Sequence, residues 1–437
     1  MSIPLDRLYQ YIEDTAQSIF KDRVIIYRFY PHGSKNLLDL TTTRLIDFYL
    51  EVMHPHIYCH DQEPLAYDFY KNMVRYDSLF GKFKHFKYPS MRQQSVLLHS
   101  EKRSTNLEQY TQDNYVPSYW WSHAVIALDW FRYARHVVLH PCPQKTFLAY
   151  NRSWGGTREY RLKFLDYLID HDLVNSCRTW FNPVDPGCQA HFQQHQFDNP
   201  KWKPIHNLEK YFHPTDADSN SSADFDLDDY NTFDIEVVLE TLFDDGRLHL
   251  TEKILRPIAL GKPFILAGTY GSLEYLRDYG FRTFDEIWPE QYDLETDSDS
   301  RLKQITSLMR DIENWDPKIR QERVAQAQII ADHNRKHFFS TEFFDQVVTE
   351  LKTNLDTAIQ QVSQSKDYQG FLNFWNDQTA DPIKLQALID ETSILLPNIA
   401  DINRIKKIMS AQTQDPDKIC LSLDQRPLSM MDLDPGS

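Results

Sequence analysis

The stretch 233–268 has the clearest arrangement of apolar and polar positions in this chain. Residues 233–240 are a short apolar run, rich in β-branched side chains, that ends on an acid, as buried parallel strands often do. Thr251 then stands where a helix N-cap is expected, and an apolar helix pattern continues from it to Gly261. PFILAG, residues 263–268, has the pattern of a second buried strand. The pattern therefore predicts strand, loop, helix and strand in that order.

Similar runs recur in the first third of the chain. Strands are expected at 24–30 and 95–101, and 56–65 is expected to be a strand that runs into a loop. Mostly helical patterns lie between the segments 24–30 and 56–65, and a helix is expected at 123–134. Alternation of this kind is the βαβ rhythm of a doubly wound domain. Residues 1–140 are therefore expected to form one Rossmann-like domain.

A second unit is expected after the Pro-rich segment HPCPQK. A strand at 146–150 leads into a loop with Gly155 and Gly156 and then into a helix, and residues 301–360 are strongly helical. We expect residues 141–360 to form a second Rossmann-like domain with long helices. Residues 361–437 are expected to be a helical appendage with a partly disordered, Pro- and Asp-rich tail. The fold class predicted for the whole chain is α/β.

The composition narrows the classes of function. A formal net charge of −16 argues against a general basic surface for nucleic acid, because neutralising phosphates needs clustered Lys and Arg. No run approaches the ~18 apolar residues of a membrane span, and the N-terminus carries charges where a signal peptide would be apolar. A soluble, cytoplasmic protein is expected.

The cysteines and histidines show no metal-binding pattern. The five cysteines are scattered without a CxxC pair, so we interpret them as reduced thiols. His191, His195 and His206 lie near one another in sequence, but their spacing fits no known site pattern. Neither a metal nor another cofactor is expected.

The helix that begins after Thr251 carries a candidate anion site. Lys253 lies in its first turn, where the helix dipole disfavours a cation, so an anion is expected nearby. The free N–H groups of a helix N-terminus favour the same anion, and together they suggest a seat for a diphosphate. Glu252 is suited to ribose hydroxyls or to a pair with Arg256. An ordinary helix opening with a solvated Glu252–Lys253 pair is the alternative.

The run TEKILRPIALGKPFI, a Gly-containing turn and then GFRTFDEIW resemble the donor-binding half of GT-B glycosyltransferases. They are most similar to the fucosyltransferase and exostosin-like group, and the resemblance covers about residues 145–284. It implies a GT-B fold, with two Rossmann-like domains facing each other across a cleft. In that group a Glu-Lys pair opening a helix grips the nucleotide-sugar, which here implies Glu252 and Lys253.

Further donor residues follow from the same resemblance. Similar enzymes place an Asn-Arg pair and another arginine against the donor diphosphate, which implies Arg152 first and Arg158 second. Glu240 and Thr241, at the end of the strand before the donor loop, are expected to line the nucleotide pocket. The alternative is that Arg158 and Arg161 are exposed helix charges, and we favour that alternative for Arg161.

The catalytic base is expected in the first domain. GT-B enzymes that invert the anomeric centre use a carboxylate there to remove the proton of the acceptor hydroxyl. HDQEPL follows an expected strand, so Asp61 is the first candidate and Glu63 the second. The alternative is that Asp61 caps a turn ahead of Pro64 and that Glu63 is solvated.

The sequence thus predicts a hexosyl- or pentosyltransferase that moves a sugar from a nucleotide-sugar to a hydroxyl acceptor. An inverting, metal-independent reaction is expected, although retaining enzymes share the donor domain. Two alternatives stay open. One is a protein that binds sugar nucleotides without catalysis. The other is a glycosyltransferase acting on hydroxymethylated DNA bases, which the net charge disfavours.

Overall fold

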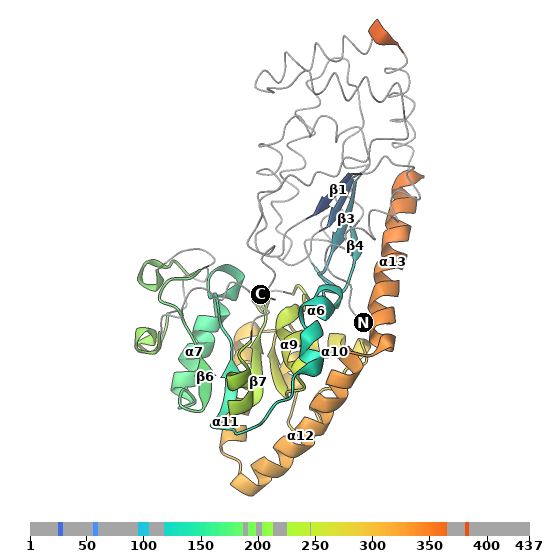
Figure 1. Cartoon of the computed structure of the whole chain (residues 1–437). Coiled ribbons are helices and arrows are strands. Elements are labelled where there is room, and N and C mark those ends of the chain that lie inside the picture. Colours follow the sequence, from blue (N-terminus) through green and yellow to red (C-terminus); the bar gives the residue numbers. More distant parts are fainter. Residues whose placement is uncertain are drawn as a thin grey trace, which may run out of the picture.

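A computed structural model of the chain (Figure 1) contains two separate parallel β-sheets with helices packed around them. The residues that the structure describes are 25–28, 56–59, 95–104, 118–186, 191–197, 203–212, 225–244, 246–364 and 381–383. Within them the fold is mixed α/β with parallel strands, which confirms the predicted class.

The first sheet has the strand order β1-β2-β3-β4, and every pairing is parallel. Its strands are β1 Ile25–Arg28, β2 His56–Cys59, β3 Ser95–His99 and β4 Ser118–Trp120. The first three confirm the expected strands in shorter form, whereas β4 was not predicted. The helix expected at 123–134 is a shorter α6, Ala124–Trp130, followed by the 3₁₀-helix η2, Arg132–His136.

The second sheet has the order β6-β5-β7-β8, again with parallel pairing throughout. Its strands are β5 Lys145–Ala149, β6 Cys177–Thr179, β7 Phe233–Leu239 and β8 Phe264–Ala267. The α-helices between and after them are α7 Tyr160–Asp170, α8 Leu227–Thr232, α9 Glu252–Leu260 and α10 Ser272–Asp278. Short 3₁₀-helices complete this part: η3 Gly156–Arg158, η4 Phe192–Gln194, η5 Leu208–Tyr211 and η6 Gln291–Leu294.

Local sequence signals explain the bounds of α9. Thr251 caps the N-terminus, since its hydroxyl accepts the backbone N–H of Lys253, and Gly261 ends the helix at φ 69°. That left-handed conformation costs glycine little, because it has no Cβ. Both ends confirm the sequence prediction. β7 and β8 also lie where the apolar runs predict them, and both strands are almost completely buried.

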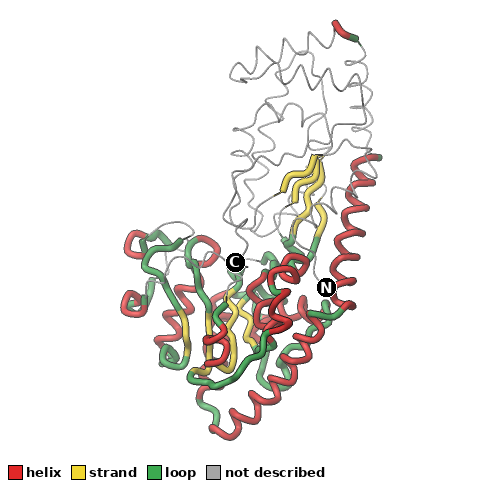
Figure 2. The backbone as a smooth tube through the Cα atoms, viewed as in Figure 1, coloured by secondary structure: helices red, strands yellow, loops and turns green. Residues whose placement is uncertain are grey.

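Three long helices follow the second sheet: α11 Ser298–Glu313, α12 Pro317–Phe338 and α13 Thr341–Ser363. They confirm the helical prediction for this region. α12 packs against α9, and α13 packs against β3, β4 and α6, so the last helix reaches the first sheet (Figure 1). The backbone tube in Figure 2 shows the same course. Among the described residues, no helix is both long and apolar enough to cross a membrane.

Candidate active site

The order of the second sheet identifies the edge at which a ligand is expected. From β5 the chain passes outward to β6 and then returns to β7 on the other side of β5. The loops after β5 and β7 therefore leave the sheet in different directions. In open α/β sheets such a switch point, at the carboxyl ends of the strands, is the usual binding crevice. The predicted donor residues belong to the loops and helices that follow these two strands.

A buried carboxylate joins the end of β7 to the start of α9. Glu240 is 0% exposed, and its oxygens accept the Thr251 N–H at 3.1 Å, the Thr251 hydroxyl at 2.7 Å and the Thr241 N–H at 3.2 Å. The Thr251 oxygen in turn accepts the Lys253 N–H at 3.3 Å. The structure therefore brings Glu240, Thr241, Thr251 and Lys253 together.

The Lys253 side chain extends over this helix start. Its ammonium donates to the Glu252 carboxylate at 2.7 Å and to the Thr251 hydroxyl at 3.1 Å. The Lys253 side chain is 15% exposed and that of Glu252 is 3% exposed, so this pair is largely screened from water. An ammonium has three donors, and two of them are used in these bonds.

Arg161 has a different position from the one expected. It is 2% exposed, so its interpretation as an exposed helix charge was wrong. Its guanidinium donates to the carbonyls of Ser153 at 2.6 Å, Leu239 at 2.7 Å and Glu240 at 3.0 Å. These carbonyls lie where the chain leaves β5 and β7 and need partners, and the planar fork of arginine supplies several donors at once. Burial lowers the pKa of Arg161.

The two predicted phosphate-binding arginines lie on the same edge. Arg152 is exposed in the loop after β5, and Arg158 is partly buried in η3. The positive charge of Arg158 adds to the effect of burial and lowers the pKa of Arg161 further. Arg158 therefore lies close to the bridge between β5 and β7. Their contact with a diphosphate stays a prediction.

Asp185 accepts backbone N–H groups of the loop after β5. The sequence analysis did not identify this residue. Its carboxylate is buried and accepts the N–H groups of Trp154 at 2.5 Å and Gly155 at 2.8 Å, together with the Ser153 hydroxyl at 2.8 Å. Backbone N–H groups in such loops often bind phosphate. Here a side-chain carboxylate already accepts them, so the N–H groups of Trp154 and Gly155 are not available to a diphosphate.

The β7–α9 loop also contacts the first sheet. Lys102 N–H donates to the Leu248 carbonyl at 2.8 Å, and Leu248 N–H donates to the Arg103 carbonyl at 2.7 Å, which makes a short antiparallel bridge. The Arg103 side chain adds bonds to the carbonyls of Gly246 at 2.8 Å and Tyr270 at 2.6 Å. We call this region, formed by residues 99–104, 121–123 and 246–249, the sheet junction.

Buried titratable side chains gather at the sheet junction, and the sequence analysis singled out none of them. His99 is the last residue of β3, Glu101 follows that strand, His123 follows β4, and His249 comes from the β7–α9 loop. Arg247 Nη1 lies 3.7 Å from Glu101 Oε1, and the rings of His123 and His249 are 6.0 Å apart. Polar residues directly after a buried strand were the available signal. β4 was not predicted, so His123 was assigned to a helix.

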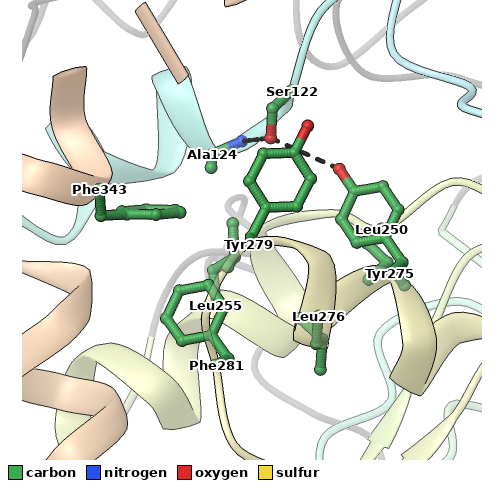
Figure 3. A pocket seen from close by; sticks show the side chains of 9 residues that line it. All are labelled: Ser122, Ala124, Leu250, Leu255, Tyr275, Leu276, Tyr279, Phe281 and Phe343. Carbon is green, nitrogen blue, oxygen red and sulfur yellow. Dashed lines mark hydrogen bonds between the residues drawn. The ribbon is translucent and has the colours of Figure 1, made fainter. Parts of the chain in front are cut away.

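A small, mostly apolar pocket lies beside the sheet junction (Figure 3). Ser122, Leu250, Tyr275, Tyr279 and Phe343 are among its lining residues. The Ser122 and Tyr275 hydroxyls are 3.4 Å apart at its edge. No predicted donor residue lines this pocket, so it is separate from the predicted diphosphate seat.

The two predicted catalytic carboxylates, Asp61 and Glu63, lie outside the described residues. Their role therefore stays a prediction. Among the residues that the structure does describe, no group of three or more His, Cys, Asp or Glu is arranged to hold a metal ion.

Comparisons with known proteins identified no relative of this chain. No protein-family model, curated protein or solved structure matches this chain.

Proposed function

We propose that this protein is a glycosyltransferase that moves a sugar from a nucleotide-sugar donor to a hydroxyl acceptor. The observation that carries the proposal is the start of α9 at the switch point of the second sheet. There the buried Glu240 binds Thr251, the N-cap of α9, and the Glu252–Lys253 pair opens the first turn of that helix, which supports a role in binding the donor.

The arrangement of the two sheets supports the finer GT-B assignment. Residues after β3 and β4 meet the β7–α9 loop, so the carboxyl ends of strands from both parallel sheets face the sheet junction. α13, which follows the second sheet, packs on β3 and β4 of the first. Two facing parallel sheets joined by a returning C-terminal helix fit the GT-B plan.

The residues at the switch point suit the departure of a diphosphate. In the proposed reaction the bond between the anomeric carbon and the donor phosphate oxygen breaks, and the nucleoside diphosphate leaves with the electron pair. Lys253, Arg152 and Arg158 would stabilise its negative charge together with the N-terminus of α9. The acceptor oxygen forms the new bond and loses its proton to a base, for which Asp61 and Glu63 are the candidates from the sequence.

A thermal-shift screen tests the donor half directly. The full chain is heated with UDP, GDP, CDP, ADP and dTDP, each alone and as common sugar conjugates. A ligand at 100 times its Kd stabilises the folded state by about 2.7 kcal/mol. A selective shift with one nucleotide is the expected result. Well-folded protein that responds to none of them would refute the proposal.

The variant Lys253→Ala tests the diphosphate seat. Loss of a hydrogen bond to a charged group should weaken nucleoside diphosphate binding by about 1.5–3 kcal/mol, roughly a 10- to 150-fold higher Kd by calorimetry. Lys318→Ala is the matched control, since Lys318 is exposed at the start of α12. Equal affinities for Lys253→Ala, the control and the wild type would remove Lys253 from the site.

Product formation separates the enzyme from a protein that only binds sugar nucleotides. Release of nucleoside diphosphate from the selected donor, with water or an added acceptor, indicates transfer. A stabilising nucleotide without any release of product would favour the binding protein instead.

A further inference from the structure

Arg103, which follows β3 of the first sheet, reaches two loops of the second sheet. Its Nε donates to the Gly246 carbonyl in the β7–α9 loop at 2.8 Å, and its Nη2 donates to the Tyr270 carbonyl in the β8–α10 loop at 2.6 Å. The guanidinium also lies over the Tyr270 ring, 4.0 Å from the ring centroid. Two hydrogen bonds and an aromatic ring thus fix the guanidinium in place before any ligand binds.

The donors on Nη1 of Arg103 are not used in these bonds. A guanidinium has five N–H donors, and two of them are on Nη1. Among the described residues this Nη1 donates no hydrogen bond, and it is not one of the fully buried polar atoms that lack a partner, so solvent reaches it. A Cβ on the neighbouring Gly271 would lie 3.5 Å from Nη1. Because glycine has no Cβ, that side of the guanidinium is left clear.

Arg103 also differs from the other cations of the sheet junction in its partners. Lys102 pairs with Asp278 at 2.8 Å, and Arg247 Nη1 lies 3.7 Å from Glu101. Within the described part of the chain, Arg103 forms no ion pair, although it is partly buried. Cations screened from water are usually neutralised by an opposite charge. The anionic group of a ligand would supply that charge here.

The two loops that Arg103 binds are loops at which the donor is expected. The β7–α9 loop continues into Thr251 and Lys253, and the β8–α10 loop follows the strand that pairs with β7. Both loops leave the carboxyl edge of the second sheet, where open α/β sheets bind ligands. Arg103 therefore brings a positive charge from the first sheet to this edge.

We propose that Arg103 is a donor-binding residue and that its Nη1 donates to an oxygen of the donor diphosphate. The donor is then held from both sheets, by Lys253 at the start of α9 and by Arg103 after β3. A guanidinium suits this task, because its planar donors stay charged and match the geometry of phosphate oxygens. This assignment rests on the proposed glycosyl transfer.

Arginine labelling tests first whether a diphosphate reaches Arg103. The full chain is treated with phenylglyoxal, which reacts with accessible guanidinium groups, and the labelled peptides are quantified by mass spectrometry. Labelling is compared without ligand and with inorganic diphosphate, UDP, GDP, CDP, ADP or dTDP at equal ionic strength. We expect Arg103 to be labelled in the free protein and protected in proportion to the fraction of protein that binds one of these diphosphates.

Arg135 is the matched control in the same experiment. Its Nη2 donates to the Phe339 carbonyl at 3.0 Å, and its guanidinium lies over the Phe339 ring, 5.2 Å from the centroid. It therefore resembles Arg103 in its contacts but lies away from the donor loops, and its labelling should not change. The proposal is overturned if Arg103 is not labelled in the free protein, or if every diphosphate leaves its labelling unchanged.

Calorimetry on Arg103→Gln then separates contact with phosphate from support of the two loops. The Kd of the nucleoside diphosphate that protects Arg103 should rise about 10- to 150-fold, as for loss of a hydrogen bond to a charged group. The dependence of this Kd on salt concentration should also become less steep, because one charge fewer meets the phosphates. Arg103→Lys keeps the charge and should keep the salt dependence, and Arg135→Gln should bind like the wild type.

The remaining outcomes separate this assignment from the proposed function. If Lys253→Ala weakens binding of the nucleoside diphosphate and Arg103→Gln does not, the donor seat stands and Arg103 lies outside it. A higher Kd in Arg103→Gln with an unchanged salt dependence would make Arg103 a support for the loops and not a ligand of phosphate. If the wild type binds none of the nucleoside diphosphates, the proposed function fails and this assignment fails with it.

Discussion

Two buried arginines hold the carboxyl-end loops of the second sheet through backbone carbonyls. Arg161 binds the ends of β5 and β7 as described above. Arg301 donates to the carbonyls of Gly268 at 3.1 Å, Glu295 at 2.6 Å and Phe243. Both place positive charge among the loops that follow the strands of the second sheet, and the charge of the buried Glu240 offsets part of that of Arg161. Fixed charge of this kind favours an anionic ligand without reorganisation on binding.

Asp293 is one buried carboxylate that makes stability depend on pH. Asp293 accepts the N–H groups of Ser272 and Leu273, each at 3.0 Å, at the start of α10. Burial raises its pKa from 3.8 to about 6. The folded state therefore binds this proton more tightly than the unfolded state does. The stability it contributes is complete below pH 4 and is lost as the pH rises through 6, at most about 3 kcal/mol at 1.36 per pKa unit.

Urea unfolding of the wild type and Asp293→Asn between pH 4 and pH 7 measures this contribution. Asparagine does not titrate, so the free energy of unfolding of the wild type should fall relative to that of the variant across this range. The m-values of the two proteins should stay equal. Parallel pH profiles would show that Asp293 titrates alike in the folded and unfolded states.

The residues that the sequence predicted correctly act through their immediate neighbours. Thr251 caps its own helix and Gly261 ends it, so both signals are local. Arg161, Asp185 and His249 act through carbonyls or N–H groups tens of residues away. A pattern of apolar and polar positions reports only on near neighbours in the sequence, so it could not predict these contacts. The contact of Lys253 with an anion was proposed from one helix turn and stays a prediction.

At the scale of elements, a buried network fixes α9 against β7. Arg256 donates to Glu236 at 2.6 Å and to the Tyr230 hydroxyl at 3.0 Å, and Tyr230 also bonds Glu236. Burial raises the pKa of Glu236. Burial alone would lower the pKa of Arg256, but Glu236, Tyr230 and Tyr150 together outweigh burial and raise that pKa. The network sets the orientation of α9, whose first turn carries Lys253.

Arg256→Met should therefore destabilise the fold strongly. It leaves the Glu236 carboxylate buried beside a single neutral donor, and breaking a buried pair in this way costs about 3–5 kcal/mol. Urea unfolding at pH 7 measures the loss. The double variant Arg256→Met/Glu236→Leu should recover most of it, because the unpaired charge is then removed as well.

Arg310→Met is the control for this change. Arg310 lies 3.5 Å from Asp311 on the exposed side of α11, and an exposed pair contributes about 1 kcal/mol or less. If Arg256→Met were no more harmful than Arg310→Met, the buried network would not be what holds α9 in place.

Element length decided which elements the sequence predicted. The long helices α11 to α13 and the strands β7 and β8 have enough residues for a clear pattern. β4 and β6 have three residues each, too few to show either an apolar run or alternation. Because β4 was not predicted, the residues that follow it, such as His123, were not recognised as lying at the carboxyl end of a sheet.

At the scale of the whole molecule, the two sheets are linked at a second place besides the sheet junction. Glu350 of α13 accepts the Tyr279 hydroxyl of α10 at 2.7 Å and the indole N–H of Trp120 at the end of β4. Asn354, one turn further along α13, donates to the Trp120 carbonyl at 2.8 Å. One face of α13 thus contacts both the end of β4 in the first sheet and the end of α10, which follows the second sheet. The sequence had predicted a domain boundary near residue 140, between these two parts.

Glu350→Leu tests whether this link couples the two sheets. Leucine leaves the Tyr279 hydroxyl and the Trp120 indole without their carboxylate, and loss of such bonds should cost about 1–3 kcal/mol in urea unfolding. Glu342→Leu is the control, since Glu342 is exposed on the same helix.

Hydrogen exchange tests the coupling between the two sheets more directly. If α13 couples the sheets, Glu350→Leu should speed exchange in β3, β4 and α10 together, because a cooperative unit opens as a whole. Faster exchange confined to α13 would mean that the two sheets open independently and that the domain boundary predicted from sequence is also the boundary of stability.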